Sequence, residues 1–263
     1  IIKRISDVID SSGTENSALE SFAVQGATVA IRDEVTGLHV VAAPTSLVMR
    51  SVKQVTGVSF NADVEMSGKR SHVTADVTVL PGRSAISGTA AVTGLDLQAL
   101  AANAAMFSGV KDVPLRANAA AKFTVNPGGT LGSADFNIVA AGQIPFAAMT
   151  DKALHVKALH LAGRYDGTAH HLALTTAELD AREARLTLGG SGDFFYDAAG
   201  ALDHVHADLA ARDVTLNMPG VFKDKVAYQS LALAADYLTG PRQFNITKLA
   251  VAGQGFALGG TAS

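Results

Sequence analysis

Histidines are the side chains in this sequence best suited to catalysis or metal binding, and six of them occur in pairs: His155 with His160, His170 with His171, and His204 with His206. Residues two positions apart on a strand face the same side, so His204 and His206 could place two imidazoles on one metal ion. However, no acidic cluster with ligand spacing accompanies them, and Val205 fits the apolar side of that strand. We therefore expect solvent-facing histidines and no metal site.

Two glycine-rich segments resemble phosphate-binding loops in composition only, Gly189-Gly190-Ser191-Gly192 and Gly253-x-Gly255. A phosphate loop needs a helix N-terminus directly after its glycines. The segments that follow, Phe194-Phe195 and Phe256-Ala257-Leu258, are instead typical of strands. We expect a β-bulge or a close approach of two backbones at these glycines.

Acidic residues that could act in acid–base catalysis occur as Asp33-Glu34, Glu178-x-Asp180 and Glu183. Each group falls where we predict a turn, and charge is common in turns. The chain has no cysteine, which excludes disulfides, cysteine-bound zinc and thiol catalysis. These residues predict no catalytic constellation and no cofactor, so we expect a protein that is not an enzyme.

The composition is rich in small apolar residues. Hydrophobic residues make up 48% of the 263 residues, aromatic residues make up 6%, and tryptophan is absent. The formal net charge of −3 predicts weak attraction to polyanions, so we expect no nucleic-acid partner. No apolar run approaches the roughly 18 residues of a membrane-spanning helix, and we expect any membrane anchor to lie outside this chain.

Apolar and polar residues alternate over most of the chain from about residue 21, and Gly, Pro, Asp and Asn separate the alternating runs. This period of two predicts antiparallel strands joined as hairpins in one long meander. The spacing of the runs is too irregular for a β-helix. The expected strands include residues 22–32, 38–42, 54–67, 72–80, 84–94, 115–125, 131–141, 154–165, 228–237 and 244–258.

Three local features follow from the same pattern. Pro44 is predicted to end its strand. The apolar parity changes between Val156 and Leu159, which predicts a bulge near Ala158. A turn near Asp180 would pair Leu172 and Leu174 with Leu186 and Leu188.

Two short helices are predicted, one before the strands and one between them. Residues 1–12 carry Ile and Val at helical spacing, which predicts a short amphipathic helix before Gly13. Asp96 is a suitable N-cap for a second helix at about residues 96–108, because an apolar stripe follows it and Gly109 provides a stop. Two short helices are not enough to cover the apolar side of the sheet.

What covers that apolar side is the functional question. In an ordinary β-sandwich, Phe60, Leu174 and Leu188 would pack against a second sheet. The shortage of large aromatic residues and the meander order favour one long curved sheet instead. A structural or adhesive β-sandwich domain with a closed core is the alternative, and a hydrolase that uses the histidines ranks last.

Two segments resemble a known family. Residues 19–37, LESFAVQGATVAIRDEVTG, are similar to the strand and Asp-containing hairpin of AsmA-like proteins of Gram-negative envelopes. Residues 88–101, GTAAVTGLDLQALA, resemble the strand-to-helix step of that family. Hairpins with Leu-x-Leu-x-Gly endings extend the likeness over residues 17–263, and it is greatest to the long bridge-type lipid transfer members of the family.

The resemblance implies a β-groove, a half-pipe or taco-shaped sheet, over residues 17–263. It implies a non-enzymatic hydrophobic conduit for phospholipid transport between the inner and outer membranes, located in the periplasm. The chain would be part of a larger protein, anchored to the inner membrane by a segment outside this chain. Its partners would be phospholipid acyl chains and, through other parts of the parent protein, both membranes.

Apolar positions of the predicted strands would line this conduit. Because acyl chains are featureless, Ala, Val and Leu suffice and no metal or cofactor is needed. The candidate lining residues are Val58, Phe60, Val64, Met66, Val73, Val77, Leu172, Leu174, Leu186, Leu188, Val205, Leu209, Leu231 and Leu233.

Overall fold

The computed structural model describes residues 20–33, 38–52, 55–80, 85–104, 107, 110–127, 129–145, 153–197, 202–217, 223–240, 243–253 and 256–262. The helix predicted over residues 1–12 lies outside these ranges. No helix among the described residues is both long and apolar enough to cross a bilayer.

The described residues form one antiparallel sheet of fourteen strands, in which each strand pairs with its neighbours in sequence from β1 to β14. This confirms the predicted mainly β fold and the meander order. The sheet is open, with β1 and β14 at its two edges. The strands are β1 Ser21–Asp33, β2 Leu38–Val52, β3 Val55–Met66, β4 Lys69–Val79, β5 Ile86–Asp96, β6 Leu115–Val125, β7 Leu131–Pro145, β8 Ala153–Asp166, β9 His171–Ala181, β10 Ala184–Tyr196, β11 Leu202–Leu216, β12 Val226–Leu238, β13 Gln243–Gly253 and β14 Phe256–Ala262.

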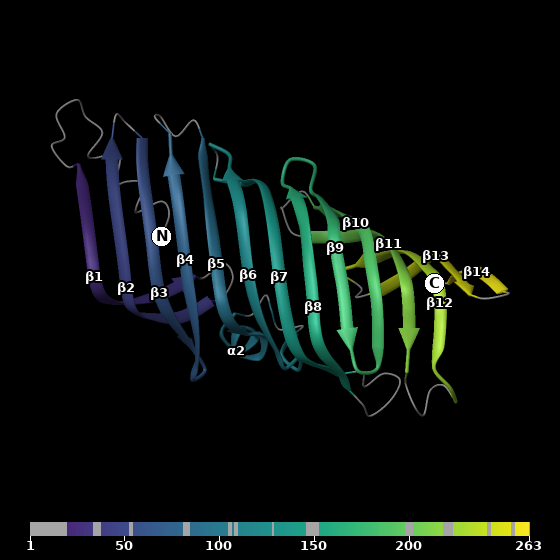
Figure 1. Cartoon of the computed structure of the whole chain (residues 1–263). Helices are drawn as coiled ribbons and strands as arrows, with labels where there is room; N and C mark the ends of the chain where they lie inside the picture. Colours follow the sequence, from purple (N-terminus) through teal and green to yellow (C-terminus); the bar gives the residue numbers. More distant parts are fainter. Residues whose placement is uncertain are drawn as a thin grey trace.

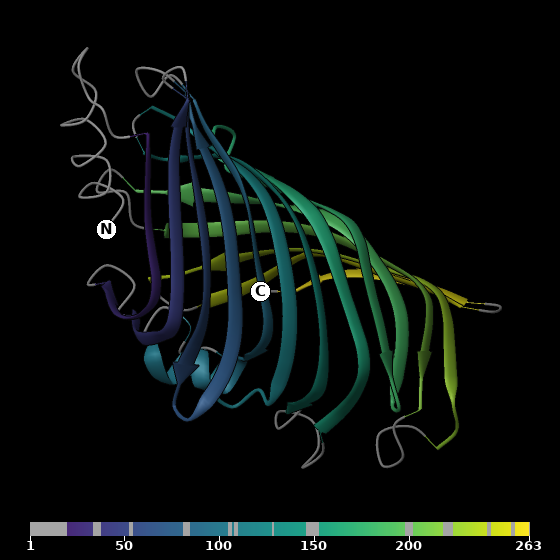
Figure 2. The same ribbon diagram turned by 60° about the vertical axis from the view of Figure 1, so that its left-hand side comes forward.

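The sheet is twisted and bowed. Figure 1 shows β1 to β8 side by side, and the series continues to the right, where β13 and β14 run at an angle to β1. In Figure 2 the strands bend along their length, and β12 to β14 run at a steep angle to β1 to β3. The right-handed twist between neighbouring strands accumulates over such a long sheet and produces this rotation.

One short helix, α2 Leu97–Asn103, interrupts the meander between β5 and β6. Asp96 caps it as predicted, because its Oδ1 accepts a hydrogen bond of 3.0 Å from the backbone N–H of Ala99. The helix is shorter than the predicted span of about 96–108. It ends where Ala104 adopts an extended conformation and is buried to 1% exposure.

The helix marks one end of the sheet, here called the α2 end, where β3 turns into β4 and β5 leads into α2. The opposite end, where β2 turns toward β3 and β4 toward β5, is called the far end. At the α2 end, Ala99 packs with Val40, Ala42, Val64 and Met66 in one buried core. A second core joins β6, β8 and β10 through Leu115, Leu154, Val156 and Ala184.

Three strand boundaries differ from the sequence-based predictions. Pro44 does not end its strand, because β2 continues to Val52 through a bulge between Ala42 and Thr45. The predicted strand over residues 244–258 is two strands, β13 and β14. Glu178 and Asp180, expected in a turn, lie within β9.

The turn after β9 lies at residues 182–183 rather than near Asp180. Leu186 therefore pairs with Leu179, and Leu188 pairs with Ala177. The predicted pairing with Leu172 and Leu174 is wrong, because these residues lie opposite Gly192 and Gly190. The predicted bulge near Ala158 is confirmed by a register shift between Val156 and Ala158.

We expect the N-cap of α2 to contribute to stability. Asp96→Ala removes the carboxylate that satisfies the Ala99 N–H, and should lower the free energy of unfolding by about 1 kcal/mol in urea denaturation. Asp96→Asn keeps an equally good capping oxygen and serves as the control. Equal losses in the two variants would show that the cap is not the source of the effect.

Candidate functional site

Strand register places apolar residues on one side of the entire sheet, here called the apolar face. Directly opposed residues on neighbouring strands share a face, so a row of partners can be followed from edge to edge. One such row takes one residue from each of the fourteen strands and contains no charged member. Its members are Phe22, Met49, Val58, Val77, Gly88, Phe123, Ala134, Tyr165, Leu172, Gly192, Ala207, Ala235, Ile246 and Ala262.

The register also places all fourteen predicted lining residues on this apolar face. Val64 and Met66 are fully buried in the core beneath α2, with exposures of 6% and 5%. The other twelve are half-buried. Apart from Met49, the fully buried apolar side chains larger than alanine in the described residues lie toward the α2 end. The helix α2 thus covers the apolar face at this end over β2, β3, β5 and β6, whereas toward the far end the face is mostly half-buried.

Two phenylalanine rings of the apolar face lie over glycines of the neighbouring strand. A methyl group placed on Gly88 would lie 2.9 Å from Cζ of Phe123, and one placed on Gly163 would lie 2.8 Å from Cζ of Phe136. Side chains at these two glycines would displace the rings. The two glycines therefore leave room for the rings over the neighbouring strand.

The opposite side, here called the polar face, carries the histidines that sequence analysis singled out. A row across β8 to β13 alternates acids with imidazoles and ends on an amide. Its members are Asp166, His171, Asp193, His206, Asp236 and Asn245. Nδ1 of His171 lies 2.6 Å from Asp193, and Nδ1 of His206 lies 2.7 Å from Asp236.

The remaining histidines of the predicted pairs have separate partners. His204 contacts Asp203 at 3.0 Å and stacks on the Phe195 ring at 4.1 Å between ring centres. His160 contacts Asn137, and the His170 ring lies beside Tyr196. His204 and His206 share a face as predicted, yet each is bound to a different acid. In the described parts of the chain, no group of three or more His, Cys, Asp or Glu side chains could hold a metal ion.

Glu183 lies at the turn between β9 and β10 and has several hydrogen-bond partners. Its carboxylate accepts hydrogen bonds from the backbone N–H of His155 at 2.7 Å, from His155 Nδ1 at 2.8 Å and from Arg182 Nε at 2.7 Å. Its carbonyl oxygen accepts from the N–H of Asn217. Burial raises its pKa, but these hydrogen bonds outweigh burial and lower the pKa to about 2. Glu183 thus ties β8 and β11 to the β9–β10 turn.

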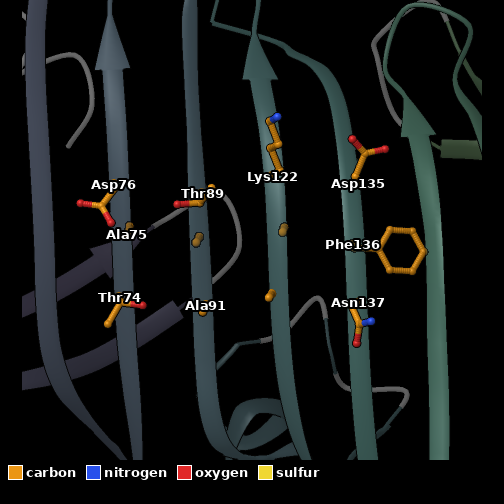
Figure 3. A pocket seen from close by; sticks show the side chains of 12 residues that line it. Thr74, Ala75, Asp76, Thr89, Ala91, Lys122, Asp135, Phe136 and Asn137 are labelled. Carbon is orange, nitrogen blue, oxygen red and sulfur yellow. The ribbon is translucent and has the colours of Figure 1, made fainter.

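A shallow depression of about 400 Å³ lies over β4 to β7 around Ala90, Ala91, Ala120 and Ala121. Figure 3 shows its charged side chains, Asp76, Lys122 and Asp135, which come from three strands. Asp76 accepts a hydrogen bond from Ser59, and Asp135 pairs with Arg164 at 3.5 Å. Both acids thus have partners that do not line the depression. We assign it no catalytic role.

We expect the His206–Asp236 pair to make stability depend on pH. The hydrogen bond to Asp236 raises the pKa of His206, while burial opposes this shift. Asp208 lies 3.4 Å from Nε2 of His206, and Asp193 lies opposite on β10. A raised pKa means that the contribution to stability is complete below about pH 6.5 and is lost as pH rises through the folded-state pKa.

His206→Gln should therefore lower the free energy of unfolding at about pH 6 by at most about 1 kcal/mol, and have less effect at alkaline pH. Urea denaturation across this range, with His39→Gln as the control, measures the difference. Wild-type and His206→Gln proteins with parallel pH profiles would contradict this prediction.

Glu183 should act in the opposite pH range. Its pKa is lowered from 4.5 to about 2, so its contribution is present above about pH 4.5 and is lost as pH falls toward 2. Glu183→Gln should lower the free energy of unfolding at neutral pH by about 1–3 kcal/mol, because charge-assisted hydrogen bonds are lost. Glu178→Gln, at an exposed position on β9, is the matched control. A loss no larger than that of the control would count against this role.

Comparison of the chain with protein-family models, with curated proteins and with solved structures finds no match. The resemblance to AsmA-like proteins therefore stays a prediction from sequence. The structure itself shows a long open antiparallel sheet with one apolar face and one polar face.

Proposed function

We propose that this protein is a non-enzymatic hydrophobic conduit for the acyl chains of phospholipids, acting between the inner and outer membranes of a Gram-negative envelope. The observation that carries the proposal is the apolar row that crosses all fourteen strands without a charged residue. An apolar surface of this continuity, accessible toward one end of the strands, is suited to hydrocarbon.

The extent of the apolar face supports the proposal. Fourteen strands have thirteen spacings, and at about 4.8 Å each the face extends about 62 Å along the sheet. The hydrocarbon core of a bilayer is only about 30 Å thick. A surface about twice that length exceeds what one stationary lipid needs, and favours a path along which lipids move.

The free energy of hydration explains why a conduit is needed. Each methylene group exposed to water costs about 0.8 kcal/mol, so two acyl chains of roughly fifteen carbons each would cost more than about 20 kcal/mol in water. A continuous apolar face removes most of this barrier without recognising any particular head group. The polar face, with its imidazole–carboxylate row, would meanwhile face the aqueous compartment.

The alternative of a β-sandwich with a closed core receives less support. A sandwich needs a second sheet over the apolar face, and the described strands all belong to one sheet. Twelve of the fourteen predicted lining residues are half-buried rather than sealed. We propose that these twelve contact lipid and that Val64 and Met66 serve the protein's own core at the α2 end.

The proposed location follows from the same function. A conduit between two membranes works in the periplasm and needs to be held at the inner membrane, for which we propose a segment outside this chain. The proposed partners are phospholipid acyl chains and, through the parent protein, the two membranes.

A photo-crosslinking residue tests the proposal. Leu188 lies on the apolar face, opposite Ala177 and Ala211, whereas its neighbour Thr187 lies on the polar face, opposite Glu178 and Arg212. After gentle purification from a Gram-negative host, a crosslinker at position 188 should label phospholipid, and one at position 187 should not. Solvent extraction and mass spectrometry identify the lipid.

Two results would contradict the conduit. One is protein repeatedly free of lipid with no label at position 188. The other is unfolding of Leu188→Asp in denaturation experiments while Thr187→Asp stays folded, because a closed core rejects a charge that an open face tolerates.

A further inference from the structure

The apolar face contains a strip of unusually short side chains across β4, β5 and β6. Ala75 lies opposite Ala90, and Ala90 lies opposite Ala121. Side chains on one face recur about every 6.7 Å along a strand, so the residues two positions away flank this strip. Toward the α2 end the flanking residues are Val73, Val92 and the shorter Ala119, and toward the far end they are Val77, Gly88 and Phe123.

The row of directly opposed residues continues beyond the strip over β7 and β8. Phe136 lies opposite Ala121, and its ring extends from β7 toward the neighbouring strand (Figure 3). Gly163 of β8 lies opposite Phe136 and leaves room for that ring, as the 2.8 Å separation from a hypothetical methyl group shows. The row is therefore low at the three alanines only. Phe136 on β7 bounds it at one end, and Phe60 on β3, which lies opposite Ala75, bounds it at the other.

The heights of the side chains determine the direction that a flexible hydrocarbon chain would take. Along β4, the apolar face presents Val73, Ala75 and Val77 in turn, so a chain parallel to the strand would cross high and low positions. Across the strands, the same surface presents alanine at three successive strands. A hydrocarbon chain lying across the strands contacts the alanine methyl groups and the longer residues beside them at once, which increases its dispersion contacts.

We propose that the alanine strip, defined as Ala75, Ala90 and Ala121, is the seat of one acyl chain, which lies across the strands along the long axis of the sheet. The inference rests on the proposed conduit function and goes further by giving the path and orientation of its substrate. Phe123 over Gly88 forms the wall of this seat toward the far end.

The chain offers matched controls for this seat. Ala91 and Ala120 follow and precede Ala90 and Ala121 in sequence, lie opposite each other and face the polar side. Ala121→Phe and Ala90→Phe raise the floor of the strip, whereas Ala120→Phe and Ala91→Phe add the same ring to the same strands on the other face. Strand propensity changes equally in each pair.

Purified proteins are incubated with vesicles of phosphatidylethanolamine and phosphatidylglycerol, reisolated, and the lipid retained is counted by mass spectrometry. We expect Ala121→Phe and Ala90→Phe to retain roughly tenfold less lipid than wild type, because the contacts of a few methylene groups are lost. The variants at positions 120 and 91 should retain lipid as wild type does. Circular dichroism and urea denaturation check folding.

A second measurement needs no bulky side chain. The chain has no cysteine, so Ala90→Cys and Ala91→Cys each provide a single thiol on a chosen face. Lipid loading should slow the reaction of the thiol at position 90 with a soluble maleimide, and should leave that at position 91 unchanged. This measurement stands if the phenylalanine variants fail to fold.

The outcomes separate the two proposals. In one outcome, wild-type protein binds lipid and the crosslinker at position 188 labels it, but the Ala90 and Ala121 variants retain lipid normally and the thiol at position 90 is not protected. This outcome overturns the alanine strip and leaves the conduit. Wild-type protein that takes up no lipid from vesicles and labels none overturns both.

Discussion

The structure depends on strand register, because a shift of one residue would exchange the two faces of a strand. Fourteen antiparallel strands keep their apolar residues on one side only because bulges correct the parity where the sequence changes it. In β5 the apolar face is carried by Val92 and then by Leu95, and the register shifts between them. In β9 the same change occurs between Leu174 and Ala177. These bulges keep the apolar row continuous.

A sheet of one layer has to stabilise each face by a different means. At the α2 end the protein covers its own apolar face, through Ala99 in one core and through Leu115 and Val156 in another. Toward the far end the same face is only half-buried, and a bound hydrocarbon chain would remove its exposed apolar surface from water. The two cores therefore occupy only part of the face, and the rest is left exposed enough for the proposed binding of hydrocarbon.

The polar face shows why histidine pairs need not mean catalysis. Alternating acids and imidazoles on neighbouring strands give directly opposed residues of opposite charge or hydrogen-bonding character. His206 contacts Asp236 and Asp208, and Glu183 joins the β9–β10 turn to β8 and to the end of β11 through His155 and Asn217. These contacts link neighbouring strands of the meander, which gives the polar residues a structural role in a sheet with an exposed face.

The sequence by itself determined the class of fold, the meander order and the apolar parity of most strands, because a period of two is a local property of the backbone. It also located the cap at Asp96 and the bulge near Ala158. Two predictions from sequence were wrong: the turn after β9 near Asp180, and the end of a strand at Pro44. The sequence missed them because turn positions and bulges depend on the pairing partner. Only the tertiary structure decided that Val64 and Met66 lie beneath α2, and that alanines from β4, β5 and β6 form one strip, because both depend on register between strands and on where the helix folds back.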